Sequence, residues 1–308
     1  MAEKQESNYT QGYSEATVAS HASRTVDSDA AFLKPYIKPT DRILDVGCGP
    51  GTITVGFHAL VDGAAGGGVT GVDISDEILA QARETAAANM DTAATPDNNN
   101  TAIEFLKADV LKGLPFPDDA FTVVYASQLF PHLATPALRY RALAEMRRVL
   151  RPGGVLATRD AAELHFYPRH YDLDRLWAGR MVRALRQGGG ESDVDRDGEN
   201  EAACFPGGDM PALFQSVGFG GSSLVVGAGT TVHSGPEMRR WFAGTLRDRL
   251  RPGDAFRESW ANAGITDGEV EETCGALGRW AEDEGGGMLR CRRRYWGGSQ
   301  DELIESDI

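Results

Sequence analysis

Short runs of apolar residues alternate with longer amphipathic segments through the first half of this 308-residue chain. Each run ends in glycine, proline or acidic residues, a pattern typical of buried strands that end in turns. The runs that predict strands lie at 43–46, 69–73, 103–107, 121–126 and 155–158. Because the segments between them have helical spacing, the pattern favours a parallel sheet that is covered on both faces.

The helices of this half carry recognisable start and stop signals. One helix is expected after Gly51, and another after Ser75, whose hydroxyl would cap it. A third is predicted over 135–150, where apolar residues recur at helical spacing before Arg151-Pro152-Gly153-Gly154 ends it. One or two helices at 16–36 precede the alternation, which extends from Arg42 to Asp160.

The pattern changes beyond Asp160, where helices predominate. Helices are predicted at 172–187, 210–217, 236–250 and 267–284, and strands at 222–227 and 288–295. A glycine-rich and acidic stretch at 188–200 predicts a loop. We interpret the added helices as a cap on the sheet, so the expected organisation is a helical lead-in at 1–40, a core at 41–160, and the rest of the sheet with its cap at 161–308.

The turn after the first predicted strand is the most informative stretch of the chain. Asp45 lies near the end of the strand, and the sequence Gly47-Cys48-Gly49-Pro50-Gly51 follows it. Glycine tolerates positive φ and lets a ligand approach its backbone closely, while the next helix points free N–H groups at that ligand. The spacing differs from the G-x-G-x-x-G fingerprint, which disfavours a nicotinamide oxidoreductase.

Two further strands are also followed by acids. Asp73 ends the second strand about 20 residues past the glycines, the spacing of a ribose-binding carboxylate. Asp109 follows the third strand. Parallel strands place their carboxyl ends at one edge of the sheet, so Asp45, Asp73 and Asp109 are expected along that edge. The alternative for each is an ordinary carboxylate at a strand end.

Four motifs in order resemble the class I S-adenosylmethionine-dependent methyltransferases, most closely the small-molecule branch of the ubiquinone-biosynthesis type. They are LDVGCGPGTIT (44–54), GVDIS (71–75), ADVLKGLPFPDDAFTVVYASQLFPHL (108–133) and MRRVLRPGGVLATRD (146–160). The segment YTQGYSEATVASHASRT (9–25) resembles the lead-in of one subgroup. The resemblance implies a doubly wound, mostly parallel, seven-stranded α/β sheet of the Rossmann-like methyltransferase type, and S-adenosylmethionine as cofactor.

The resemblance also implies a set of cofactor-binding residues. The glycine turn would surround the amino-acid part of the cofactor, Asp73 would accept both ribose hydroxyls, and Asp109 would accept the adenine amino group. Ile74 would pack against the adenine, and Val110 would donate to it from its backbone. Ser127 and Gln128 would face the methionine end. The complete set is Asp45, Gly47, Cys48, Gly49, Gly51, Asp73, Ile74, Asp109, Val110, Ser127, Gln128 and Arg24.

Candidate catalytic groups lie in the lead-in and after the fourth strand. In the resembling subgroup the lead-in folds over the cofactor, so Arg24 would pair with its carboxylate and Tyr13 or His21 would face the methyl group. A polar surface helix is the alternative. His132 is the candidate base, since imidazole titrates near neutral pH. Related enzymes often have a His-His pair where this chain has Pro131-His132, which puts that role in doubt.

Aromatic residues of the predicted cap are candidates for an apolar acceptor pocket. Packing in the core is the alternative for all of them. They are Phe166, Tyr167, Trp177, Trp241 and Phe242.

Composition narrows the class of partner. A formal net charge of −14 would repel a polyanion, so nucleic acid is not an expected partner. The basic cluster at Arg290 and 292–294 is a local exception that we interpret as a solvated edge strand. The four cysteines form no C-x-x-C pair, and no metal site is expected. No apolar run approaches the length of a membrane span, so we expect a cytoplasmic protein that does not bind membranes.

The expected activity is therefore in-line methyl transfer to an oxygen, sulfur, nitrogen or carbon atom of a small-molecule acceptor, partly apolar and of the secondary-metabolite kind. One alternative is an enzyme of the same fold with non-methylating chemistry, such as a cyclisation. Another is a non-catalytic module that binds the cofactor and serves as an interaction platform. The sequence leaves the acceptor and the oligomeric state open.

Overall fold

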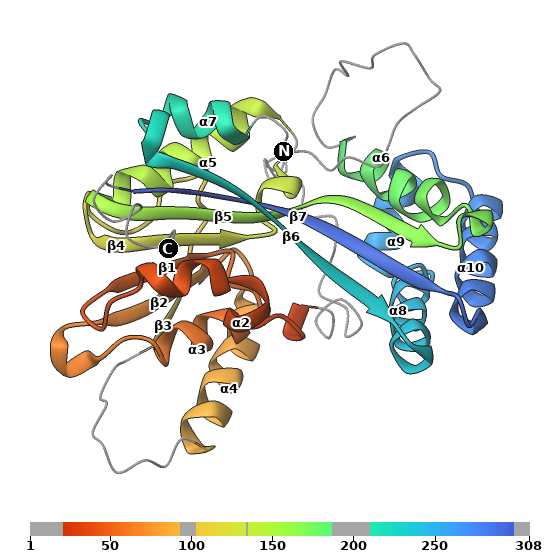
Figure 1. Ribbon diagram of the computed structural model, residues 1–308, viewed down its shortest axis with the longest axis horizontal. Coiled ribbons are helices and arrows are strands. Elements are labelled where there is room, and N and C mark those ends of the chain that lie inside the picture. The colour runs from red at the N-terminus through yellow and green to blue at the C-terminus, as the bar shows by residue number, and fades with distance from the viewer. Residues whose placement is uncertain (1–20, 93–102, 134, 187–209, 299–308) are drawn as a thin grey trace.

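The computed structural model describes residues 21–92, 103–133, 135–186 and 210–298, which form one sheet with helices packed around it (Figure 1). The seven strands lie in the order β3-β2-β1-β4-β5-β7-β6. The pairs from β3 to β5 are parallel, whereas β7 is antiparallel to both of its neighbours. The doubly wound, mostly parallel, seven-stranded α/β fold that the sequence predicts is therefore confirmed.

The strands follow the predicted runs closely in the first half of the chain. Strand β4 is buried along its whole length, as a central parallel strand covered on both faces should be. The strands are β1 (Arg42–Val46), β2 (Gly68–Asp73), β3 (Ile103–Lys107), β4 (Phe121–Ser127), β5 (Leu150–Tyr167), β6 (Leu224–Ser234) and β7 (Gly287–Gly297).

The helices begin where the sequence places their caps. The Ser75 hydroxyl accepts a hydrogen bond from the Ile78 N–H at 3.3 Å, and Thr135 caps α5 in the same way through Leu138. The described helices are α2 (Val26–Asp29), α3 (Thr52–His58), α4 (Asp76–Thr92), α5 (Pro136–Val149), α6 (Arg180–Arg186), α7 (Met210–Ser216), α8 (Pro236–Asp248), α9 (Ala255–Asn262) and α10 (Asp267–Glu282). A π-helical turn, Asp174–Gly179, leads into α6. Helix α9 is absent from the sequence prediction.

Strand β5 is much longer than the predicted 155–158 and continues past Asp160 into the cap. Its parallel partner β4 accompanies it only as far as Arg159, but β7 pairs with it from Leu156 to Tyr167. The antiparallel partner supplies the hydrogen bonds that extend the strand. The cap and the core therefore share one continuous sheet, and the expected boundary at residue 160 lies inside β5.

The basic strand β7 does not lie at the edge of the sheet. It is paired on both sides, with β5 and with β6, and β6 is the outer strand. Arg292 is buried. The expectation of a solvated edge strand is therefore wrong, because β7 lies between two other strands and its other arginines are at least half-buried.

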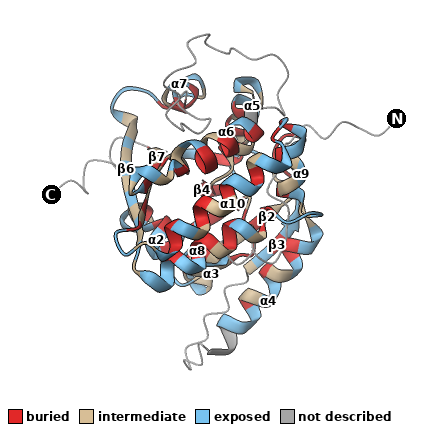
Figure 2. Cartoon of the chain, turned by 90° about the vertical axis from the view of Figure 1, so that its right-hand side faces the viewer, coloured by how far each residue is buried: buried red, intermediate tan, exposed pale blue. Residues whose placement is uncertain are grey.

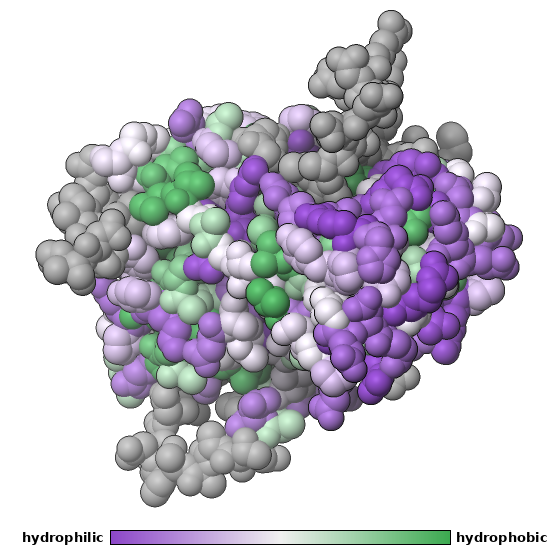
Figure 3. Space-filling model, turned by 45° about the vertical axis from the view of Figure 1, so that its right-hand side comes forward, coloured by the Kyte–Doolittle hydropathy of each residue, from purple (hydrophilic) through white to green (hydrophobic). Residues whose placement is uncertain are grey.

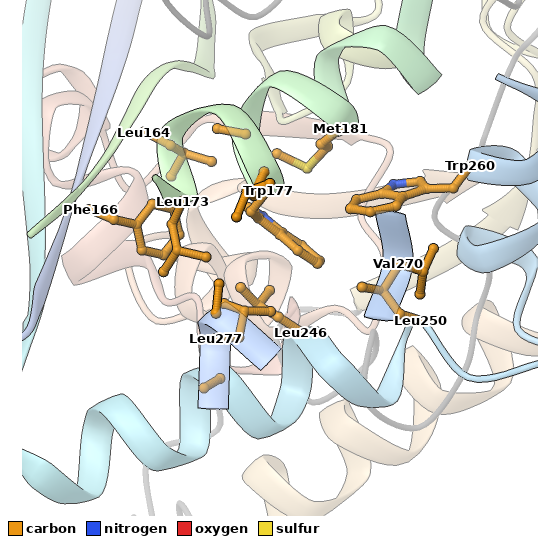
Figure 4. Close-up of a cluster of buried hydrophobic side chains, with 14 of the residues drawn as sticks. Leu164, Phe166, Leu173, Trp177, Met181, Leu246, Leu250, Trp260, Val270 and Leu277 are labelled. Atoms are coloured by element: carbon orange, nitrogen blue, oxygen red, sulfur yellow. The ribbon is translucent and has the colours of Figure 1, made fainter. Parts of the chain in front are cut away.

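Apolar residues are buried in separate clusters of the core and the cap. The cap cluster contains the indoles of Trp177 and Trp260, whose ring centroids are 5.5 Å apart, with Met181 and Leu246 close by (Figure 4). Figure 2 shows that α8 and α10 turn buried residues inward and exposed residues outward. The outer face of the cap is mostly hydrophilic (Figure 3). None of the helices in the described ranges is both long and apolar enough to cross a membrane.

Candidate functional site

A large cavity lies at the carboxyl ends of the parallel strands and extends between them and the cap. The empty space between its walls is about 1630 Å³, and this figure includes space that is open to solvent. Its walls come from the glycine turn, the ends of β2 and β4, and the cap elements α6, α8 and β7.

The glycine turn is held in place by β2. The N–H groups of Gly47 and Cys48 both donate to the Val72 carbonyl, at 2.8 and 3.0 Å. Gly47, Gly49 and Gly51 all have positive φ, which glycine adopts without strain. Gly51 does not line the cavity. It precedes α3, where a Cβ would lie 3.0 Å from the Ala82 Cβ and 3.1 Å from the Phe105 ring.

The acids at the ends of β1 and β2 are oriented by hydrogen bonds. The Thr54 hydroxyl donates to Asp45 at 2.7 Å, and burial raises the pKa of Asp45 to about 7. Asp73 accepts from the Gly49 N–H at 3.1 Å and from the Ser75 N–H at 3.2 Å. The glycine turn thus fixes the direction of the Asp73 carboxylate.

Asp109 completes the acidic edge. Its Oδ1 accepts from the Leu111 N–H at 2.9 Å, and the Lys112 ammonium lies 3.8 Å from its Oδ2. All three predicted acids line the same cavity, as the carboxyl ends of parallel strands require. The other predicted cofactor residues that line it are Gly47, Cys48, Gly49, Ile74, Val110, Ser127, Gln128 and Arg24.

Gln128 turns the chain out of the sheet after β4. It has a φ of +59°, an uncommon conformation for a residue other than glycine. Its backbone N–H donates to the Arg159 carbonyl at 2.9 Å, which anchors the turn to β5. This local backbone constraint holds Ser127 and Gln128 at the wall of the cavity.

A second group of lining residues is basic. His21, Arg24 and His132 lie here, together with Arg249 and Arg290 from the cap. Burial lowers the pKa of His132 to about 4, with Arg24 and Arg249 acting in the same direction. The pKa of His21 is likewise lowered by burial, and its neighbours include all three arginines.

The low pKa of His132 corrects one expectation from the sequence. An imidazole poised near neutral pH is not what the structure contains, because burial and two guanidinium groups disfavour the protonated ring. His132 is neutral over the physiological range. Tyr13, the remaining catalytic candidate, lies outside the described residues.

Only one of the predicted acceptor aromatics lines the cavity. Trp177 does so from the π-helical turn. Phe166 is buried in the cap cluster against the Trp280 ring, and Phe242 stacks on His233. Tyr167 and Trp241 point to solvent, with 44% and 41% of their surfaces exposed.

Sequence reasoning missed the aliphatic and basic side chains that form the cap wall. The sequence does show the basic cluster of β7, but it does not show the strand pairing that turns Arg290 toward the cavity. The missed lining residues are Leu164, Met181, Leu185, Leu246, Arg249 and Arg290.

Comparison with known proteins matches residues 43–154 to the family model described as a methyltransferase domain. The chain is 45% identical over 296 residues to the probable methyltransferase ltbC of Aspergillus luteorubrus, covering 95% of this chain and 98% of that protein. It is 36% identical over 125 residues to the ubiquinone/menaquinone biosynthesis C-methyltransferase UbiE of Methylobacterium nodulans, covering 40% of this chain and 42% of that one. The crystal structure of the YcgJ protein of Bacillus subtilis has the same fold, with a TM-score of 0.51 at 15% identity, over 88% of this chain and 97% of that chain.

Proposed function

This chain belongs to the class I S-adenosylmethionine-dependent methyltransferases, and we propose that it methylates a partly apolar small molecule in the cavity described above. S-adenosylmethionine is the cofactor, and when bound it supplies a methyl group made electrophilic by a positively charged sulfur. The remaining chemistry must come from residues that bind, orient and shield the acceptor.

The residues of the glycine turn fit this cofactor. Gly47 and Gly49 line the cavity without side chains, so a ligand can lie against their backbone. The Asp73 carboxylate is oriented by two N–H groups and would bind the ribose hydroxyls. Asp109 would accept from the adenine amino group, and Arg24 would pair with the cofactor carboxylate.

The observation that carries the proposal is the continuity of the cavity. The same space that the glycine turn lines is also lined by Trp177, Met181 and Leu246 from the cap. Apolar walls of this kind exclude water and favour an acceptor with an apolar body. The acidic cofactor end and the apolar cap end together support two ligands that meet inside one enclosure.

His132 is our candidate for the group that accepts the acceptor's proton. It lines the cavity, and its ring is neutral at physiological pH, the state in which an imidazole can take up a proton. With a pKa of about 4, however, it is a weak base. An acceptor atom that ionises easily, such as a thiol, an acidic phenol or an enol, would suit such a base better than an aliphatic alcohol.

Calorimetry with S-adenosylmethionine, S-adenosylhomocysteine and NAD tests the cofactor first. We expect both sulfur ligands to bind and NAD to give no heat. Incubation with S-adenosylmethionine and a panel of apolar metabolites, followed by mass spectrometry, then tests methyl transfer. Binding of the cofactor without methylation of any panel member would favour the non-methylating enzyme or the binding module. Binding of NAD alone would refute the proposed function.

A further inference from the structure

The chain enters α6 through the π-helical turn Asp174–Gly179 rather than through an ordinary α-helical turn. A π-helical turn bonds residue i to residue i+5, is rare, and frequently lies at a functional site. The additional residue changes the direction of the side chains in the turn relative to those that follow it. Trp177 projects from this turn into the cap cluster and lines the cavity, and Met181 and Leu185 of α6 line it as well (Figure 4). The wall that the cap presents to the cavity therefore depends on the π-helical turn.

Asp174 holds the beginning of the turn against the end of β5. Its Oδ1 accepts from the Phe166 N–H at 2.7 Å, and its Oδ2 lies 2.9 Å from the His165 Nδ1. The same carboxylate forms an ion pair with Arg169, in the segment that follows the strand. One side chain thus joins the start of the turn to three neighbouring residues.

Arg180 holds the end of the turn against α10. It is buried, and its Nη1 donates to the Glu269 carbonyl and to the Thr273 hydroxyl, both at 2.5 Å. Its Nη2 donates to the Glu272 carboxylate at 2.6 Å. The Thr273 hydroxyl also reaches the carbonyl of Leu176, inside the turn, at 3.2 Å. Charged side chains therefore bind both ends of the turn to neighbouring elements.

These two anchors hold an uncommon backbone geometry in place. Neither Asp174 nor Arg180 lines the cavity, so neither side chain reaches a ligand there. A buried guanidinium is strongly destabilising once a partner is removed, so the bonds of Arg180 keep the end of the turn fixed. Without the anchors the segment could take up the commoner α-helical geometry, which would rotate Trp177 relative to Met181. The direction of the Trp177 side chain is therefore set by two residues outside the cavity.

We propose that Asp174 and Arg180 are positioning residues for the acceptor, because they hold the π-helical turn in the geometry that places Trp177 on the cavity wall. This inference rests on the proposed function, since it concerns the acceptor side of the same cavity. The glycine turn and the strand ends, which would bind the cofactor, belong to other elements. Loss of an anchor should therefore weaken binding of an apolar molecule and leave binding of the cofactor unchanged.

The test measures binding of three apolar probes to the protein saturated with S-adenosylhomocysteine. The probes are 1-naphthol, 4-phenylphenol and geraniol, each titrated by calorimetry. We expect the wild-type protein to bind at least one of them, and Arg180→Gln to bind that probe about tenfold or more weakly, because the wall no longer matches it. Arg180→Lys retains a cation that can donate to the Glu269 carbonyl, so it should restore part of the affinity.

Arg239→Gln is the matched control in the same cap. Arg239 is buried like Arg180 and also donates to backbone carbonyls, those of Ala281 at 3.4 Å and Gly286 at 3.3 Å, but not to the π-helical turn. Both variants should lose stability in a denaturant titration, whereas only Arg180→Gln should lose affinity for the probe. A merely structural role of Arg180 predicts the same affinity for the probe in both variants.

Asp174→Asn provides a second test at the other end of the turn, also in case Arg180→Gln does not fold. It keeps an oxygen that can accept from the Phe166 N–H but loses the ion pair with Arg169, and it should weaken binding of the same probe. If no probe binds the wild-type protein, or if both anchor variants bind the probe as the wild type does, the inference is overturned. Loss of S-adenosylhomocysteine affinity in the anchor variants would contradict it as well. Failure of S-adenosylhomocysteine to bind the wild-type protein would instead refute the proposed function itself.

Discussion

Asp29 forms a buried ion pair with Arg159, 130 residues further along the chain. The acid lies at the end of α2, ahead of the sheet, and the arginine lies on β5. Burial alone would raise the pKa of Asp29, but the nearby arginines, Arg159 foremost, and a hydrogen bond from the Ser28 hydroxyl together outweigh burial and lower it. The pair therefore joins the segment that precedes the sheet to the strand that connects core and cap.

Replacing Asp29 tests this connection. Asp29→Asn leaves the Arg159 guanidinium buried without its counter-charge, and we expect a loss of about 3–5 kcal/mol in the free energy of unfolding. Asp27→Asn is the control, because Asp27 is exposed and pairs with Lys34 at the surface. That change should cost about 0–1 kcal/mol. Denaturant titration measures both, and equal effects would contradict the role assigned to the buried pair.

Replacing two glycines that both have positive φ distinguishes the cost of backbone strain from the cost of steric crowding. Gly51→Ala would introduce both, since its Cβ would press on Ala82 and Phe105, and we expect a destabilisation of about 2–4 kcal/mol. Gly66 has a φ of +90° but nothing within 4 Å of its Cβ position. Gly66→Ala should therefore cost only about 1–2 kcal/mol. Thermal unfolding measures the loss of stability in both variants. If Gly66→Ala is as destabilised as Gly51→Ala, crowding at Gly51 does not contribute to the loss.

Asp73 is expected to contribute directly to cofactor affinity. Asp73→Ala should weaken binding of S-adenosylhomocysteine by about 1.5–3 kcal/mol, the value of hydrogen bonds to a charged acceptor. Asp76→Ala is the matched control, because Asp76 is exposed and pairs with Lys107 outside the cavity. Calorimetry should show unchanged affinity for the control. An Asp73→Ala protein with wild-type affinity would remove Asp73 from the proposed site.

The buried His132 should make stability depend on pH. Its pKa in the folded protein is about 4, below the ordinary 6.5, so the unfolded chain takes up a proton first as the pH falls. The neutral ring makes its full contribution to the free energy of unfolding above pH 6.5. That contribution is lost as the pH falls from 6.5 to about 4, and the loss is at most about 3 kcal/mol. Asn at position 132 does not titrate, so His132→Asn should lose less stability over this interval. The free energy of unfolding of both proteins is measured at a series of pH values. If the two curves run parallel between pH 6.5 and 4, the buried neutral His132 is not the source of the pH dependence.

The two cap tryptophans differ in their expected effects on the acceptor. Trp177 lines the cavity and is buried, whereas Trp241 points to solvent. Trp177→Phe should weaken acceptor binding while keeping most of the packing, and Trp241→Phe should change neither binding nor stability by more than about 0.5 kcal/mol. A panel of apolar acceptors assayed with both variants distinguishes them. An equal loss in the Trp241 variant would mean that the exposed face also takes part.

The core of the fold was predictable because its signals are local. A strand, a glycine turn and a helix follow one another within a short stretch, and Asp73 lies at the spacing that parallel strands impose. The extent of β5 was not predictable in this way. Its outer half depends on β7, which lies more than a hundred residues away in the chain, and no local pattern reports a distant partner.

The cap was harder to predict because burial there depends on packing between helices. Trp241 and Phe242 are neighbours on α8, yet the first is exposed and the second is buried. Met238, one turn before Trp241, is exposed as well, so an apolar stripe of α8 points outward. Hydrophobicity alone would place these side chains inside. Which face of α8 turns inward is set by α10 and β6, which pack against it.

The passage of β5 through both halves of the molecule has a consequence for protein engineering. Strands β5 and β7 are paired from Gly297, beside the core, to Gly287, beneath the cap helices, with one shift of register between Ala161 and Glu163. To exchange the cap with that of a relative, both strands of this ladder would have to be cut and joined to new strands. A shift of one residue in their pairing would turn every following side chain to the opposite face of the sheet. Altering the choice of acceptor should therefore be easier by replacing single side chains of the cavity wall than by transplanting the cap as a module.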